Sequence, residues 1–84
     1  MNRRVLWLPD AEAELTTIWV ESLHRDEVTS AANEIDAALR RDALDCGESR
    51  DAGRRIFLIG PLAITFVVAD DTVEVQHAWR IDRR

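Results

Sequence analysis

The hydrophobic residues of this chain follow a helical period in the first half of the sequence and a strand period in the second. Residues 3–8 form a short aliphatic and aromatic run that Pro9 closes, which predicts a first strand. Pro9 followed by Asp10 is typical of a helix start. Apolar residues then recur at helical spacing, at Ala11, Leu15, Ile18 and Trp19. We expect a helix over 9–23, with its glutamates on other faces, namely Glu12, Glu14 and Glu21.

A second helical period follows a short corner at residues 24–26. Its apolar positions are Val28, Ala31, Ala32, Ile35, Ala38 and Leu39. Small alanines let two helices approach closely, so the two segments predict an antiparallel helical hairpin. Residues 42–53 then lose both periods and gain turn-forming residues, which indicates a loop between the helices and the rest of the chain.

Three β-prone runs complete the chain, at residues 54–59, 62–69 and 72–79. The breaks between them, Gly60-Pro61 and Asp70-Asp71, are two residues long and fit hairpin turns. The order is β-α-α-β-β-β, which predicts an α+β fold with the helical hairpin packed on a small, mainly antiparallel sheet. With 84 residues there is room for one core, so we expect a single domain over 1–84.

Composition narrows the setting in which this fold works. The single Cys46 requires no oxidising compartment, and no apolar run is long enough for a signal peptide or a membrane span, so we expect a cytoplasmic protein. We expect no metal and no cofactor. The net charge is −5 and the acidic residues concentrate in the helical half, which argues against non-specific binding of nucleic acids. Every basic residue is arginine, and the chain has no tyrosine.

Several strings, in order along the chain, resemble the RelE/ParE superfamily of toxins from bacterial type II toxin–antitoxin systems, which includes plasmid-stabilisation proteins. They are Pro9 to Leu15, Ile18-Trp19, Ile35 to Leu39, Gly47-Glu48-Ser49-Arg50, Arg55, Gly60-Pro61-Leu62 and Phe66-Val67-Val68. The resemblance implies a growth-inhibiting toxin whose sheet forms the working surface and whose partner is a cognate antitoxin. RelE-like members are similar to ribosome-dependent mRNA endoribonucleases, and ParE-like members inhibit DNA gyrase by binding. Neither implies a membrane or a small-molecule cofactor.

The catalytic candidates, should the chain cleave RNA, are Arg55, Arg80 and His77. Cleavage requires a base, an acid and a cation for the phosphorane, and arginine supplies only the last of these. Arg55 matches a basic position of the family, and we expect it on the working face. Strand alternation puts His77 in phase with Val73, Val75 and Trp79, the set expected to face the helices, which favours a structural histidine. A β-bulge would reverse that phase.

The binding candidates are Arg50, Arg54, Arg83 and Trp79. Arg50 lies in a loop whose amides could seat a phosphate, and Arg83 belongs to a basic C-terminus of the kind seen in the family. Trp7, Trp19 and Trp79 lie in apolar patterns and are expected in the core, although an exposed Trp79 would stack on a base or anchor an antitoxin. His24 is expected at the surface.

Three functions remain open from the residues. The absence of lysine and tyrosine, the acidic charge, and Ala63 at a position where RelE-like nucleases carry arginine favour a ParE-like or catalytically weakened toxin. A RelE-like endoribonuclease using the arginines and His77 is the alternative. A non-toxic interaction module on the same scaffold is the third.

Overall fold

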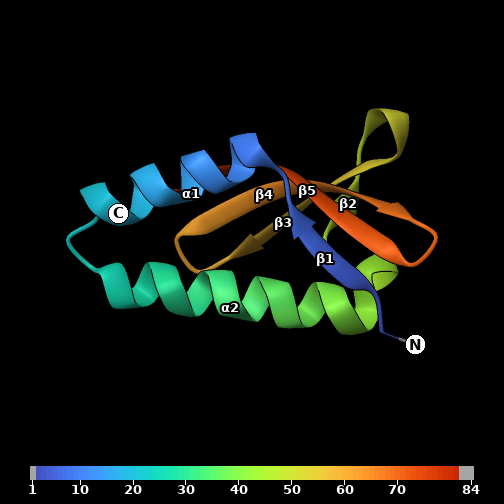
Figure 1. The fold of residues 1–84 in the computed structure, drawn as a ribbon, viewed down its shortest axis with the longest axis horizontal. Helices are drawn as coiled ribbons and strands as arrows, with labels where there is room; N and C mark the ends of the chain where they lie inside the picture. The colour runs from blue at the N-terminus through green and yellow to red at the C-terminus, as the bar shows by residue number, and fades with distance from the viewer. Residues whose placement is uncertain (1, 82–84) are drawn as a thin grey trace.

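Residues 2–81 are described by a computed structural model, and this part of the chain forms two helices and five strands (Figure 1). In chain order they are β1 (Arg4–Trp7), α1 (Pro9–Glu21), α2 (Arg25–Asp42), β2 (Glu48–Ser49), β3 (Arg54–Ile59), β4 (Leu62–Ala69) and β5 (Thr72–Arg80). Single turns of 3-10 helix at Ala43–Asp45 and Asp51–Gly53 flank β2. The expected α+β order is confirmed, and β2 is an addition inside the segment predicted to be a loop.

The strands form one mixed sheet in the order β1-β5-β4-β3-β2. β2, β3, β4 and β5 are antiparallel neighbours, and β1 pairs with β5 in parallel. Both predicted two-residue turns are present, joining Ile59 to Leu62 and Ala69 to Thr72. The first residue of each turn has a positive φ, 56° at Gly60 and 43° at Asp70. Two-residue hairpin turns require this conformation at their first central position.

The helices run antiparallel and are joined at one end by a short turn (Figure 1). Arg25, the first residue of α2, stabilises that turn by donating to the backbone carbonyls of Trp19 (3.1 Å) and Val20 (2.8 Å) at the end of α1. Its guanidinium also lies 4.6 Å from the centre of the Trp19 ring. Within residues 2–81, neither helix combines the length and the apolarity that crossing a bilayer requires.

The hydrophobic core lies between the helices and one side of the sheet, which we call the covered face. The buried residues of α1, α2, β4 and β5 in this core are Ala11, Val28, Ala31, Ile35, Leu39, Leu62, Ile64, Phe66, Val73, Val75 and Ala78, and Phe57 and Ile59 of β3 pack against them. Of the three tryptophans expected in this core, Trp7 packs against it, whereas Trp19 and Trp79 are 40% and 41% exposed. Most of the apolar residues at the helical and strand periods of the sequence are therefore buried in one cluster.

Strand β5 carries one more residue than β4 at its midpoint. Val75 pairs with Phe66 and His77 pairs with Thr65, so Gln76 is inserted between two consecutive pairs. This arrangement is a β-bulge, which leaves one residue of the longer strand unpaired and bends that strand.

The bulge reverses the alternation of side chains along the second half of β5. Ala78 is 4% exposed and belongs to the core, whereas His77 and Trp79 are exposed on the opposite side. The expectation that His77 and Trp79 face the helices together with Val73 and Val75 is therefore wrong. The physical reason is that the period of two holds only while both strands advance one residue at a time.

Candidate functional site

The side of the sheet turned away from the helices, here called the open face, carries the polar side chains that could act on a ligand. It is defined by cross-strand partners that alternate with the core residues of each strand. Its members are Arg4, Leu6, Arg54, Ile56, Leu58, Ala63, Thr65, Val67, Glu74, His77 and Trp79. Leu58 and Trp79, the cross-strand neighbours of Ala63, are 52% and 41% exposed and form an apolar ridge with Ala63 buried between them.

A shallow hollow of about 680 Å³ lies at the centre of the candidate site. Arg54, Val67, Gln76 and His77 line it from the sheet, and residues 8–10 line it from the start of α1. The bulge at Gln76 therefore brings an imidazole and a guanidinium to the walls of one depression. The imidazole and the guanidinium could bind an anion or move a proton next to one, with the carboxylate of Asp10 on the opposite wall as a competing partner for the guanidinium.

The His77 ring contacts Glu14 of α1. Its Nδ1 lies 3.4 Å from Oε1 of Glu14, and the same carboxylate oxygen accepts the backbone N–H of Ala78 at 3.0 Å. Both side chains are about half exposed, so the pair contributes little to stability as an ion pair. Glu14 was expected on a face of its helix other than the apolar one, and this expectation is wrong because its side chain contacts the edge of β5.

Arg55 lies on the covered face, as the partner of the buried Phe66. Its guanidinium donates to the carbonyls of Cys46 (2.9 Å) and Gly47 (3.3 Å) and to Oγ of Ser49 (2.8 Å). These contacts satisfy backbone acceptors of the segment before β3. The expected position of Arg55 on the working face is therefore wrong, and its neighbour Arg54 takes that place.

Gly47 explains why the segment held by Arg55 lies so close to β3. Its φ is +66°, and a Cβ at this position would collide with the carbonyl oxygen of Ile56. Only glycine allows this approach without displacing the two-residue strand β2 that follows. The string Gly47-Glu48-Ser49-Arg50 thus has a structural role in which Arg50 forms an ion pair with Glu48 at 3.2 Å, at the sheet edge.

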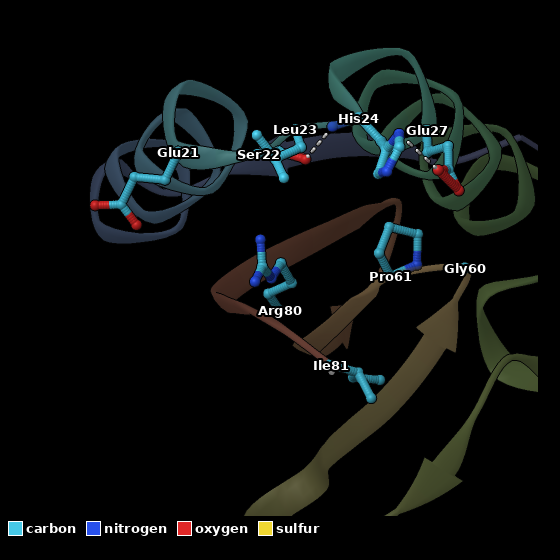
Figure 2. Close-up of a pocket in the computed structure, with 9 residues that line it drawn as sticks. All are labelled: Glu21, Ser22, Leu23, His24, Glu27, Gly60, Pro61, Arg80 and Ile81. Atoms are coloured by element: carbon cyan, nitrogen blue, oxygen red, sulfur yellow. Dashed lines mark hydrogen bonds and ion pairs between the residues drawn. The ribbon is translucent and has the colours of Figure 1, made fainter. Parts of the chain in front are cut away.

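Arg80 lies on the covered side, because its cross-strand partner is the buried Leu62. It lines a cleft of about 530 Å³ between the turn joining the helices and the turn joining β3 to β4. Figure 2 shows Arg80 below Ser22, with His24 facing Pro61 across the cleft. Arg80 and Arg55 were catalytic candidates together with His77, and the structure places neither of them in the hollow that His77 lines.

The remaining candidates lie apart from the hollow. Arg83 is outside the described residues. His24 is exposed, as expected, with Nδ1 3.8 Å from Oε2 of Glu27. Cys46 is buried and its Sγ lies 3.7 Å from the carbonyl oxygen of Ala38. Burial, with the Asp42 carboxylate adding to it, raises the pKa of the Cys46 thiol above its ordinary value of 9.0, which disfavours the reactive thiolate.

Sequence reasoning missed Glu14 and Gln76. Glu14 stands one turn from Ala11 and Ile18, so a carboxylate on the core-facing stripe of α1 was the available signal. Gln76 gave no signal of its own, because a polar residue between Val75 and His77 also fits a regular strand.

Comparison with known proteins places this geometry in a recognised scaffold. No protein-family model and no curated protein matches the sequence. Among solved structures, a chain of the chromosomal ParDE TA system from P. aeruginosa superposes with a TM-score of 0.75 at 19% identity, covering 95% of this chain and 97% of that one. A chain of the toxin-antitoxin complex RelBE2 from Mycobacterium tuberculosis gives 0.78 at 17% identity, covering 96% and 93%. The fold is RelE/ParE-like.

A third solved structure is also similar to this chain over most of its length. It is the conserved hypothetical protein HP0894 from Helicobacter pylori, with a TM-score of 0.57 at 14% identity, covering 95% of this chain and 94% of that one. At such identities the likeness establishes the fold, and activity has to be argued from the residues on the RelE/ParE-like sheet.

Proposed function

We propose that this chain is the toxin of a type II toxin–antitoxin pair, acting in the cytoplasm as one domain over residues 1–84 and neutralised by a cognate antitoxin. The proposal is supported by the RelE/ParE-like fold, which matches chains of two toxin–antitoxin structures over nearly their full length. It is also supported by the exposed apolar residues of the open face, Leu6, Leu58 and Trp79, which suit a protein partner.

Inhibition by binding, as in ParE-like toxins that act on DNA gyrase, is the mechanism that the geometry supports best. The observation that carries it is the position of Arg55. Its guanidinium is engaged with three acceptors on the covered face, and Arg80 lines a separate cleft. Two of the three catalytic candidates thus lie apart from the hollow that would have to hold the scissile phosphate.

Cleavage of mRNA is the second candidate, and the position of His77 favours it. His77 and Arg54 line the same hollow, so an imidazole could take the proton of a 2′-hydroxyl as its oxygen attacks the phosphorus, while a guanidinium stabilises the charge of the phosphorane. The P–O5′ bond then breaks, and the leaving 5′-oxygen takes its proton from the imidazolium or from water. Trp79, two residues further along the open face, offers a ring for stacking a base. In this mechanism Arg54 replaces Arg55 as the cation of the site.

Induced expression of the full chain in a bacterial host separates these functions. For the binding mechanism we expect growth arrest with unchanged mRNA 5′ ends. We also expect the purified chain to inhibit supercoiling of a plasmid by purified gyrase. Arrest with new mRNA 5′ ends that disappear in His77→Ala would instead establish cleavage. Co-expression of a small reading frame found next to the gene is expected to restore growth if that frame encodes the antitoxin. A chain that leaves growth, gyrase and mRNA unaffected would be a non-toxic interaction module, and the toxin proposal would be wrong.

A further inference from the structure

The side on which His77 and Trp79 lie is set by the register of one half of β5. Continued without a bulge, the alternation that begins at Val73 and Val75 would turn both side chains toward the helices. The observed register instead places the small Ala78 on that side. Whether His77 and Trp79 lie on the open face therefore depends on whether β5 adopts the bulged register or a regular one.

The two halves of β5 differ in what lies along their outer edge. β1 pairs with residues 72–75, and its ladder ends where the N–H of Leu8 donates to the carbonyl of Val75 at 2.9 Å. Beyond that point α1 takes the place of a strand, and Ala13, Glu14, Thr17 and Ile18 lie beside Ala78. An outward backbone N–H in this half has no strand to donate to, and leaving it without a partner is costly.

Glu14 supplies the missing acceptor. Its Oε1 accepts the N–H of Ala78 at 3.0 Å, which ties the bulged register of β5 to α1. The same oxygen lies 3.4 Å from Nδ1 of His77, so the carboxylate also contacts the side chain that the bulge has turned outward. With Nδ1 engaged, Nε2 is the ring nitrogen left for a ligand in the hollow.

We propose that Glu14 is the positioning residue of the open face, which holds β5 in its bulged register through the Ala78 amide and orients the His77 ring through Nδ1. A slip of the register would turn His77 and Trp79 to the covered face and remove both side chains from the site. The importance of Glu14 for toxicity rests on the proposed function, whereas its effect on β5 does not.

The structural part is tested by NMR on the purified full chain. Glu14→Ala removes the acceptor, Glu14→Gln keeps an acceptor oxygen without the charge, and Glu34→Ala is the control at an exposed helical glutamate. We expect the Ala78 amide to exchange with solvent about tenfold faster in Glu14→Ala, with a smaller change in Glu14→Gln and none in the control. The tautomer ratio of the His77 ring should change in both Glu14 variants.

Unchanged Ala78 exchange and an unchanged His77 tautomer in both Glu14 variants would overturn the proposal. Should Glu14→Ala fail to fold, the Glu14→Gln spectra decide alone, because that variant keeps the size and an acceptor of the native side chain. A tautomer change restricted to the Glu14 variants supports orientation of the ring, which a general loss of stability does not produce.

The functional part uses growth arrest on induction. If Glu14 acts through the register and His77, Glu14→Ala relieves the growth arrest and Glu14→Gln relieves it less. The double variant Glu14→Ala/His77→Ala then relieves the arrest no further than the more effective of the two single variants does. Fully additive effects would overturn action through His77. A wild-type chain that causes no arrest overturns the proposed function alone, and the NMR comparison then still decides the role of Glu14.

Discussion

Arg54 and Arg55 are neighbours in the chain and identical in chemistry, yet they lie on opposite faces of the sheet and have different surroundings. On the covered face, Arg55 is fixed by three acceptors and holds the segment before β3 in place. On the open face, Arg54 is exposed at the wall of a hollow. The Arg55 guanidinium therefore completes the fold, whereas Arg54, whose Nε donates to the carbonyl of Asp51 at 3.3 Å, remains exposed beside the hollow. A charged residue near a candidate site is informative only once its face is known.

The largest difference between the faces is expected from apolar truncations. Phe66→Ala removes a ring that is fully buried on the covered face, and it should lower the free energy of unfolding by about 3–5 kcal/mol. Leu58→Ala, at a half-exposed position of the open face, should cost under about 1 kcal/mol. Urea denaturation of both variants measures the contrast. Equal losses would mean that the open face is packed as tightly as the core.

The arginine pair should separate stability from activity. Arg55→Ala leaves two carbonyls and a hydroxyl without their donor and should cost about 1–3 kcal/mol of unfolding free energy. Arg54→Ala should change stability by no more than about 0.5 kcal/mol and reduce growth arrest instead. Arg55→Lys is the control that keeps the charge and loses the fork of donors. Loss of toxicity in Arg55→Lys at full stability would return Arg55 to the site.

Deletion of Gln76 tests whether this extra residue alone makes β5 irregular. His77 would still follow a residue paired with Phe66, so His77 and Trp79 should remain on the open face in an unbulged strand. We expect a loss of roughly 1 kcal/mol, because the strand must straighten beside α1. The indole N–H signals of the three tryptophans report the outcome. Movement of the Trp79 signal to a buried environment would contradict it.

The smallest effect is a pH dependence confined to the covered face. The folded chain keeps the Cys46 thiol protonated at pH values where the unfolded chain releases the proton, because burial raises the folded pKa above 9.0. Stability from this group is therefore complete below about pH 9 and is lost as pH rises further, by at most roughly 1.4 kcal/mol per pH unit. Cys46→Ala should show a flatter dependence above pH 9. Parallel curves for both proteins would rule out this coupling.

The sequence carried the larger elements because their signals are local. The helical period of Val28 to Leu39 and the two-residue turns at Gly60 and Asp70 required no knowledge of the rest of the chain. The face of β3 could not be read in that way, since Ile56 and Leu58 are as apolar as Phe57 and Ile59. Its phase is decided by packing of Phe57 and Ile59 against the core and by the hydrogen bonds of Arg55 to the segment before β3, and neither of these is visible in the alternation of the strand itself.

The candidate site was less predictable than the fold for the same reason. His77 belongs to a regular alternation in the sequence, and the extra residue before it is favoured by contacts of β5 with α1, including the hydrogen bond from the Ala78 N–H to Glu14. The small size of Ala78 would have been the one local hint. Glu14, from a helix more than sixty residues earlier, completes the arrangement through contacts that no local pattern encodes.

The brevity of β2 has a consequence for how copies of this chain meet one another. A strand of two residues, with Glu48 and Arg50 at its ends, offers few backbone groups to the edge of another sheet. Edge-to-edge growth into larger β-assemblies is thereby discouraged on that side. The chain can therefore present Leu58 and Trp79 to a partner while the β2 edge of its sheet is poorly suited to pair with another strand.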